Sequence, residues 1–175
     1  MVESRELVFN VAFTVPVNDD PESPVLTLEE FWRGLRRGGE KPYLFADYVA
    51  DTEVLGRKSE NEFTRRLIMA DGAVHTAKGA VLEQNVRNAE NLLTEAITID
   101  SGARSTMLIS RGGRESDKPT DLFLTAVYEL HVPGVVPESD RAKEIQEEYS
   151  LLARGAARTV VAKIREWKAN GTLEQ

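Results

Sequence analysis

The sequence predicts a single α+β domain in which a seven-stranded antiparallel sheet curls around a long C-terminal helix, with two short helices between the first and second strands. Three observations indicate this arrangement. The chain opens with a strand-like alternation, continues with short strands separated by tight turns, and closes with a long amphipathic segment. At 175 residues the chain is long enough to bury a core without disulfides, so we treat residues 1–175 as one domain.

The first strand is indicated by apolar residues at every second position. These residues are Leu7, Phe9, Val11, Phe13 and Val15. Acidic residues precede this run and polar residues interrupt it, which favours a strand over a signal peptide. The sequence T-L-E-E from Thr27 to Glu30 then forms a capping box and starts a helix. Gly38 and Gly39 are expected to end that helix, and a second short helix or turn covers 42–47.

Six further strands are expected in the middle of the chain. They are Val49–Lys58, Glu62–Met69, Ala73–Glu83, Leu92–Asp100, Arg104–Arg111 and Leu122–Val132. Asp71-Gly72 and Ser101-Gly102 are typical of compact hairpin turns. The last segment, from Ser139 to Ala169, carries apolar residues at steps of three and four and is closed by Asn170-Gly171, as in an amphipathic helix.

The expected sheet can bury its apolar face only against this last helix. A twisted sheet that wraps one helix does not close tightly along its whole length, so we expect a hollow between them. The two early helices lie between strands one and two in the chain order, and they are expected to form the floor of that cavity.

Composition excludes several classes of function. The formal net charge of −7 disfavours nucleic acid and anionic membranes as partners. The chain has no cysteine and two histidines, which excludes thiol chemistry and cysteine-rich or histidine-rich metal sites. No run reaches the roughly 18 apolar residues of a membrane span. We expect a soluble cytoplasmic protein, a monomer or weak homodimer, that uses neither a metal nor a cofactor.

Several short words in the sequence, taken with this order of elements, resemble a known superfamily. The words are Leu28–Leu35, Tyr48–Leu55, Asp121–Leu124 with Val127–Glu129, and Val161–Trp167 with Ala169–Gly171. The chain resembles the START/Bet v 1-like superfamily, the helix-grip fold of lipid carriers, pollen allergens and polyketide cyclases. More narrowly it looks like the AtaL-like proteins, which are often encoded beside fungal secondary-metabolism genes. The resemblance implies an internal cavity that holds a hydrophobic small molecule, such as a polyketide or an aromatic intermediate.

Polar residues on apolar strand faces are the candidates for chemistry, because burying them costs stability unless they are paired or used. Arg65 shares a phase with Phe63, and Glu95 shares one with Ile97. We predict that Arg65 stabilises an enolate or phenolate, that Glu95 or His75 acts as a base, and that Tyr128 orients the ligand. The alternative is structural: Arg65 and Glu95 pair with each other or with solvent, and Tyr128 bonds a backbone carbonyl.

Apolar and aromatic residues on the same faces are predicted to contact the ligand. They are Phe9, Phe13, Trp32, Phe63, Leu67, Ile97, Tyr149 and Leu152. Tryptophans at helical spacing beside leucine and isoleucine are more often core residues, which we favour for Trp167 and leave open for Trp32.

Three functions fit this scaffold. The first is a cofactor-independent enzyme that promotes cyclisation, dehydration or isomerisation by holding one reactive conformer and stabilising oxyanion charge. The second is a carrier or sequestering protein for a lipid-like ligand. The third is a protein-interaction module that uses the sheet surface.

Overall fold

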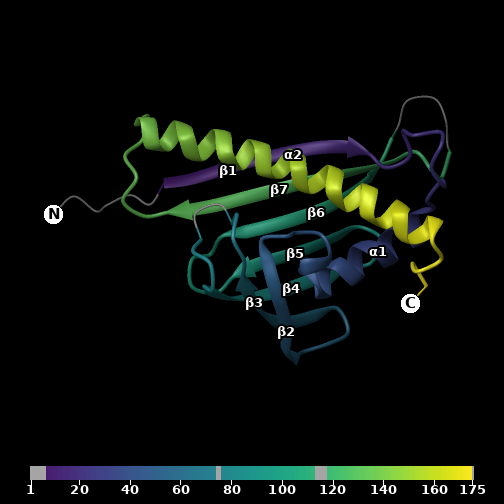
Figure 1. Cartoon of the computed structure of the whole chain (residues 1–175), viewed down its shortest axis with the longest axis horizontal. Helices are drawn as coiled ribbons and strands as arrows, with labels where there is room; N and C mark the ends of the chain where they lie inside the picture. Colours follow the sequence, from purple (N-terminus) through teal and green to yellow (C-terminus); the bar gives the residue numbers. More distant parts are fainter. Residues whose placement is uncertain (1–6, 74–75, 113–117, 175) are drawn as a thin grey trace.

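The computed structural model describes residues 7–73, 76–112 and 118–174 (Figure 1). The strands are β1 (Leu7–Pro16), β2 (Val49–Arg57), β3 (Glu62–Met69), β4 (Val81–Ala89), β5 (Leu93–Thr98), β6 (Arg104–Arg111) and β7 (Leu122–Val132). The helices are α1 (Leu28–Glu40), the 3₁₀ helix η1 (Pro42–Leu44) and α2 (Asp140–Ala169). This confirms the predicted α+β class and order of elements.

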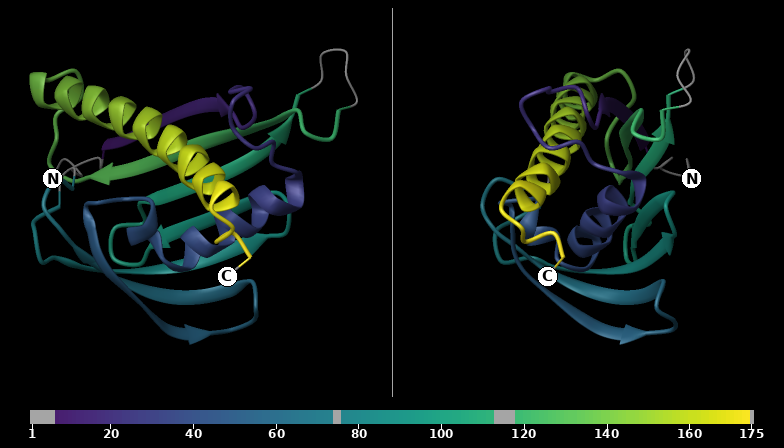
Figure 2. Two further views of the ribbon diagram at one scale, coloured as in Figure 1. Left: turned by 45° about the vertical axis from the view of Figure 1, so that its right-hand side comes forward. Right: turned by 90° about the vertical axis from the view of Figure 1, so that its right-hand side faces the viewer.

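The described strands form one antiparallel seven-stranded sheet in the order β1-β7-β6-β5-β4-β3-β2. Strands β1 and β2 are therefore the two edges, although α1 and η1 are the only helices between them in the chain. Figure 2 shows α2 lying across the open side of the curved sheet, with α1 beneath its C-terminal half. Helix α2 packs chiefly on β1 and β7, which leaves the rest of the concave face for α1, η1 and a hollow.

The capping signals in the sequence act as expected. Thr27 Oγ1 accepts from Glu30 N–H at 3.2 Å and Glu30 Oε2 accepts from Thr27 N–H at 2.8 Å, which completes the capping box of α1. Helix α2 ends at Ala169, and Gly171 follows with a φ of +74°. Because that conformation strains other residues, glycine is the residue type suited to this helix end.

Gly38 and Gly39 have a different role from the predicted one. Helix α1 continues past them to Glu40, and both glycines are buried in its last turn. A Cβ at Gly38 would overlap the ring of Phe45, and a Cβ at Gly39 would lie 3.0 Å from Thr94 Cγ2. The pair permits close packing of α1 rather than ending it.

The main core lies between α1, the C-terminal half of α2 and the sheet. Phe31 and Leu35 of α1 and Ile164 of α2 are almost fully buried there. A second cluster joins Phe9 and Val11 of β1 to Ile145 and Tyr149 in the N-terminal half of α2. These clusters fix α2 at one side of the sheet.

One strand was misplaced by sequence reasoning. The expected strand Ala73–Glu83 is replaced by β4, which covers Val81–Ala89. Its inward positions include Gln84 and Asn88, and these polar side chains hid the apolar alternation of a strand. Ala77, Gly79 and Ala80 belong to the connection before β4, in which Gly79 has a φ of +79°.

Candidate ligand cavity

A cavity of about 1070 Å³ lies between the concave face of the sheet, the α1–η1 segment and α2. Leu35 of α1, Phe45 after η1, Leu67 of β3, Met107 of β6 and Leu152 of α2 contribute apolar surface to it. The expected floor is thus present, since residues of α1 and η1 line the cavity. Its size is at the upper end of the range of ligand sites, roughly 300–1,000 Å³.

Arg65 is the one arginine of the described cavity lining that is buried, with 6% of its surface exposed. Nε and Nη2 donate to Oε1 of Gln84, its cross-strand neighbour on β4, at 3.0 and 2.7 Å. Nη1 donates to the backbone carbonyl of Gly39 in the last turn of α1. The negative end of the helix dipole therefore compensates part of the guanidinium charge.

No carboxylate among the described residues pairs with Arg65. Its three hydrogen bonds use three of the five N–H donors of a guanidinium, which leaves two for a ligand. Burial lowers the pKa of Arg65 to about 10, while the nearby Tyr48 hydroxyl opposes that change. Arg65 is consequently still a cation at neutral pH, and no carboxylate among the described residues neutralises its charge beside the largely apolar cavity.

Three tyrosines, Tyr48, Tyr128 and Tyr149, are linked to Arg65 by a series of pairwise interactions. Burial raises the pKa of Tyr48, and a hydrogen bond with Tyr128 and the charge of Arg65 partly offset that increase. Burial raises the pKa of Tyr128 well above its usual value, and the Tyr48 hydroxyl raises it further. The ring of Tyr149 meets that of Tyr128 edge-on, with 6.4 Å between centroids, and burial raises the Tyr149 pKa to about 12.

All three phenols are thus neutral at physiological pH. They can donate hydrogen bonds, and they do not act as bases. The Tyr48 hydroxyl interacts with the charge of Arg65, so it can donate to a ligand oxygen that also contacts the guanidinium.

The structure brings five of the predicted site residues together around the cavity. They are Arg65, Leu67, Tyr128, Tyr149 and Leu152. All five were placed by strand or helix phase alone, and the phases of β3, β7 and α2 agree with the structure.

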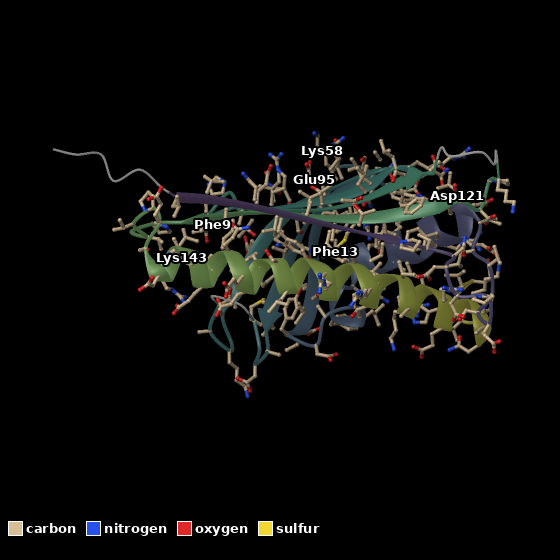
Figure 3. The ribbon with its side chains drawn as sticks, turned by 90° about the horizontal axis from the view of Figure 1, so that it is seen from above. Phe9, Phe13, Lys58, Glu95, Asp121 and Lys143 are labelled. Atoms are coloured by element: carbon tan, nitrogen blue, oxygen red, sulfur yellow. The ribbon has the colours of Figure 1, made fainter. Side chains whose placement is uncertain are left out.

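The predictions that Glu95 and Ile97 face the cavity are wrong. On β5 the buried positions are Thr94, Ala96 and Thr98, so Glu95 and Ile97 belong to the outer face. Figure 3 shows Glu95 on the side of the sheet away from α2. Glu95 forms ion pairs with Arg87 at 3.4 Å and Arg104 at 3.7 Å. The phase was inverted because the inward face of β5 borders a cavity and carries polar residues.

Four predicted contacts are core residues outside the cavity lining. Phe9 and Phe13 lie between β1 and α2 (Figure 3), where Phe13 is covered by the guanidinium groups of Arg154 and Arg158. Trp32 is 6% exposed within the main core, and Phe63 packs with Val86 and Ala96. Phe9, Phe13 and Phe63 lie on strands β1 and β3 and Trp32 lies on α1, and neighbouring side chains pack against all four. His75 lies outside the described residues.

Sequence reasoning missed Tyr48, Gln84 and Thr98. Gln84 holds Arg65, and its Nε2 donates to Thr98 Oγ1 at 3.2 Å. The signal was available in part, because an amide and a hydroxyl fall at inward strand positions once β4 and β5 are placed correctly. Tyr48 precedes β2 and has no periodic signal at all.

Solved structures share this architecture. The di-domain ARO/CYC protein StfQ from the steffimycin biosynthetic pathway superposes with a TM-score of 0.66 and 13% identity, over 96% of this chain and 54% of that longer chain. A START superfamily protein from Mycobacterium smegmatis gives a TM-score of 0.63 and 13% identity, over 90% of this chain and 97% of the other. The curved antiparallel sheet and the long C-terminal helix define a protein with the helix-grip fold that these structures share.

The chain belongs to the AtaL family. The family described as "Acetylaranotin biosynthesis cluster protein L" matches residues 11–171. The protein of that name from Aspergillus terreus (strain NIH 2624 / FGSC A1156) is 60% identical over 175 residues, which covers 99% of each chain. The resemblance drawn from the sequence words is confirmed.

The described helices include none with the length and apolar character required to cross a membrane. Among the same residues, no three histidine, aspartate or glutamate side chains gather as a metal site would require.

Proposed function

We propose that this protein binds a hydrophobic intermediate of secondary metabolism, polyketide-like or aromatic, in the cytoplasm, and promotes its cyclisation, dehydration or isomerisation without a cofactor. The Arg65 guanidinium carries the proposal, because it is a buried cation that lacks a carboxylate partner among the described residues and borders a largely apolar cavity. Such a charge costs stability, and an electron-rich ligand oxygen compensates it.

The ligand oxygen takes the two remaining donors of Arg65 and the hydroxyl proton of Tyr48. An enol, a phenol or a polarised ketone presents such an oxygen, and each gains negative charge there when a neighbouring C–H or O–H bond loses its proton. Donors already fixed by Gln84 and Gly39 need no reorganisation as that charge develops. In a cavity with few water molecules this interaction is stronger than in bulk water.

The second contribution is conformational. Aromatic and aliphatic walls from α1, α2 and the sheet hold a flexible chain in one folded shape, and this converts a rare conformer into the bound one. Ring closure of a polyketide-like chain depends on that selection.

A carrier function is the alternative, and one observation favours it. The described lining holds its carboxylates, Asp47, Glu129 and Glu166, on partly or fully exposed residues, and none of them pairs with Arg65. Near Arg65 the described lining therefore offers a cation and hydrogen-bond donors, but no carboxylate that is placed to act as a general base. A carrier needs binding alone.

The experiment begins with native mass spectrometry of the protein purified from its producing organism, to identify a co-purifying small molecule. That molecule, or its precursor, is then incubated with wild type, Arg65→Met and Glu95→Gln, and followed by liquid chromatography and mass spectrometry. An enzyme converts it faster than buffer does, Arg65→Met loses that acceleration, and Glu95→Gln keeps it. Binding without conversion establishes the carrier, and a protein that holds no small molecule contradicts both.

A further inference from the structure

The inward face of the sheet carries a row of polar side chains across the middle of largely apolar strands. Arg65 of β3 is the cross-strand partner of Gln84 on β4, and Gln84 is the partner of Thr98 on β5. Gln84 Nε2 donates to Thr98 Oγ1 at 3.2 Å, so the contact that holds Arg65 continues across the sheet. All three residues are more than nine-tenths buried, and all three line the cavity.

The row continues on the next two strands and returns to Arg65 through Tyr48. Ser105 of β6 is the cross-strand partner of Tyr128 on β7. The hydroxyl of Tyr128 hydrogen-bonds that of Tyr48, which in turn interacts with the charge of Arg65. We call the six residues of this row the polar belt, and each of them lines the cavity: Arg65, Gln84, Thr98, Ser105, Tyr128 and Tyr48.

Apolar residues flank the belt on both sides, because side chains of one strand face recur at every second residue. On one side lie Leu67 of β3 and Leu82 of β4, each two residues from the belt. On the other side lie Ala96 of β5 and Met107 of β6, again two residues from the belt. All four residues line the cavity, so its surface is apolar on either side of a polar middle.

The cavity extends away from the belt in both directions. Its lining follows β3 from Arg65 to Met69, and it follows β5 in the opposite direction from Thr98 to Thr94. Each of these spans corresponds to about 13 Å along a strand. Arg65 therefore lies near the middle of the cavity rather than at one end of it.

The belt supplies hydrogen-bond donors at more than one point. Thr98 Oγ1 already accepts from Gln84, which leaves its hydroxyl proton for a ligand in addition to the donors of Arg65 and Tyr48. Ser105 adds a half-buried hydroxyl. One cation with several neutral donors suits a ligand segment in which two neighbouring oxygens share one negative charge. The enolate of a β-diketone is such a segment.

We propose that the polar belt binds an oxygen-bearing segment in the middle of an elongated ligand, and that apolar groups of the ligand lie on both sides of the belt. The inference rests on the ligand-binding function proposed above. It narrows the substrate class to molecules in which a β-diketone or its enol separates two apolar groups. A molecule with the same segment at one end would leave half of the apolar lining in contact with water.

The test compares two isomeric probes that carry the same enolisable β-diketone at different places. In 4-methyldibenzoylmethane the diketone lies between two aryl groups, whereas in 4-phenylbenzoylacetone it lies at the end of a biphenyl. Isothermal titration calorimetry measures their dissociation constants with wild type. The first isomer should bind about tenfold more tightly, because it fills the apolar surface on both sides of the belt.

Two truncations on opposite sides of the belt make the test specific to each side. Leu82→Ala and Met107→Ala remove apolar surface from the cavity, and both residues are only half-buried. Each variant should weaken binding of 4-methyldibenzoylmethane about threefold to tenfold, whereas only one of them should weaken binding of 4-phenylbenzoylacetone. Because both isomers are measured on the same protein, a general loss of stability does not produce this difference.

Equal affinity of wild type for the two isomers, or tighter binding of 4-phenylbenzoylacetone, would overturn the central position of the oxygen-bearing segment. A loss of 4-methyldibenzoylmethane affinity in one truncation or in neither would overturn it too, because the ligand would then not contact both sides of the belt. In these cases the ligand-binding function survives, since a diketone still binds. If neither isomer nor 4-hydroxybiphenyl binds wild type, both that function and the inference are wrong.

Discussion

Arg65 and Gln84 form a two-pronged contact across β3 and β4, in which one amide oxygen, Gln84 Oε1, accepts from both Nε and Nη2 of the guanidinium. The contact fixes the direction of the cation without neutralising it. A carboxylate in place of the amide would hold the same geometry and cancel the charge, so the choice of glutamine preserves a positive potential for the cavity.

Replacement of Arg65 by methionine tests that potential. Arg65→Met should leave the free energy of unfolding equal to or above that of wild type, because a buried charge is removed and its volume is nearly kept. Affinity for the phenolate form of 4-hydroxybiphenyl should fall roughly tenfold to a hundredfold, the value of a charge-assisted hydrogen bond. Arg65→Lys is the matched control that keeps charge. A lower stability with unchanged affinity would assign Arg65 a purely structural role.

Gln84→Glu makes the same test without touching Arg65. The isosteric carboxylate should pair with the guanidinium and raise the midpoint of thermal unfolding, since the buried cation gains an opposite charge. Binding of the phenolate probe should weaken about tenfold, because the charge is already compensated. Calorimetric titration and thermal melts measure both effects. Tighter phenolate binding in this variant would contradict the role given to Arg65.

Gly155 lies in the middle of α2, lines the cavity, and has open space where a Cβ would point. Gly155→Ala should stabilise the protein by about 1 kcal/mol, because glycine is the weaker helix former. The same variant should leave the affinity for 4-hydroxybiphenyl unchanged. Gly155→Phe should instead reduce probe affinity, since the ring would enter space that the ligand needs. Equal affinity for both variants would place the ligand away from this part of α2.

Gly34 has the opposite surroundings. A Cβ there would lie 2.6 Å from Ile164 Cγ2, at the contact between α1 and α2. Gly34→Ala should therefore destabilise the fold by about 1–3 kcal/mol through overpacking. Gly56→Ala on β2 is the control, because nothing lies within 4 Å of its Cβ position. Urea unfolding measures both variants, and a Gly34→Ala protein as stable as wild type would show that the two helices are not in close contact.

The raised pKa of Tyr149 predicts that the folded state loses stability at alkaline pH. Its pKa is about 12 in the folded state, whereas an unfolded tyrosine loses its proton near pH 10. The folded state thus binds more protons between these values, so stability falls as the pH rises from about 10 towards 12. Tyr149→Phe should show a shallower decline in urea unfolding at pH 9, 10 and 11. The lowered pKa of Arg65 acts in the opposite direction in both proteins and cancels in their difference. Identical slopes would refute the assignment.

The sequence predicted which face of a strand is buried only where the inward residues are mostly apolar. On β3 the residues Phe63, Leu67 and Met69 alternate with exposed or half-buried ones, and Arg65 was placed correctly with them. On β5 the inward residues are Thr94, Ala96 and Thr98, while Leu93 and Ile97 are outside. A hydrophobic pattern cannot choose between the two faces when the inward residues of the strand are themselves polar or small, as on β5.

The sequence alone determined the local structure and the class of protein: the capping box at Thr27, the glycine that ends α2, the order of elements along the chain, and the family. These features depend on contacts between near neighbours and on periodicity, both of which are written in the chain. Only the tertiary structure decided which side chains meet. The contacts of Arg65 with Gln84 and Gly39 and the position of Glu95 on the outer face both depend on strand register and sheet curvature. Those properties are set by packing between segments far apart in the chain.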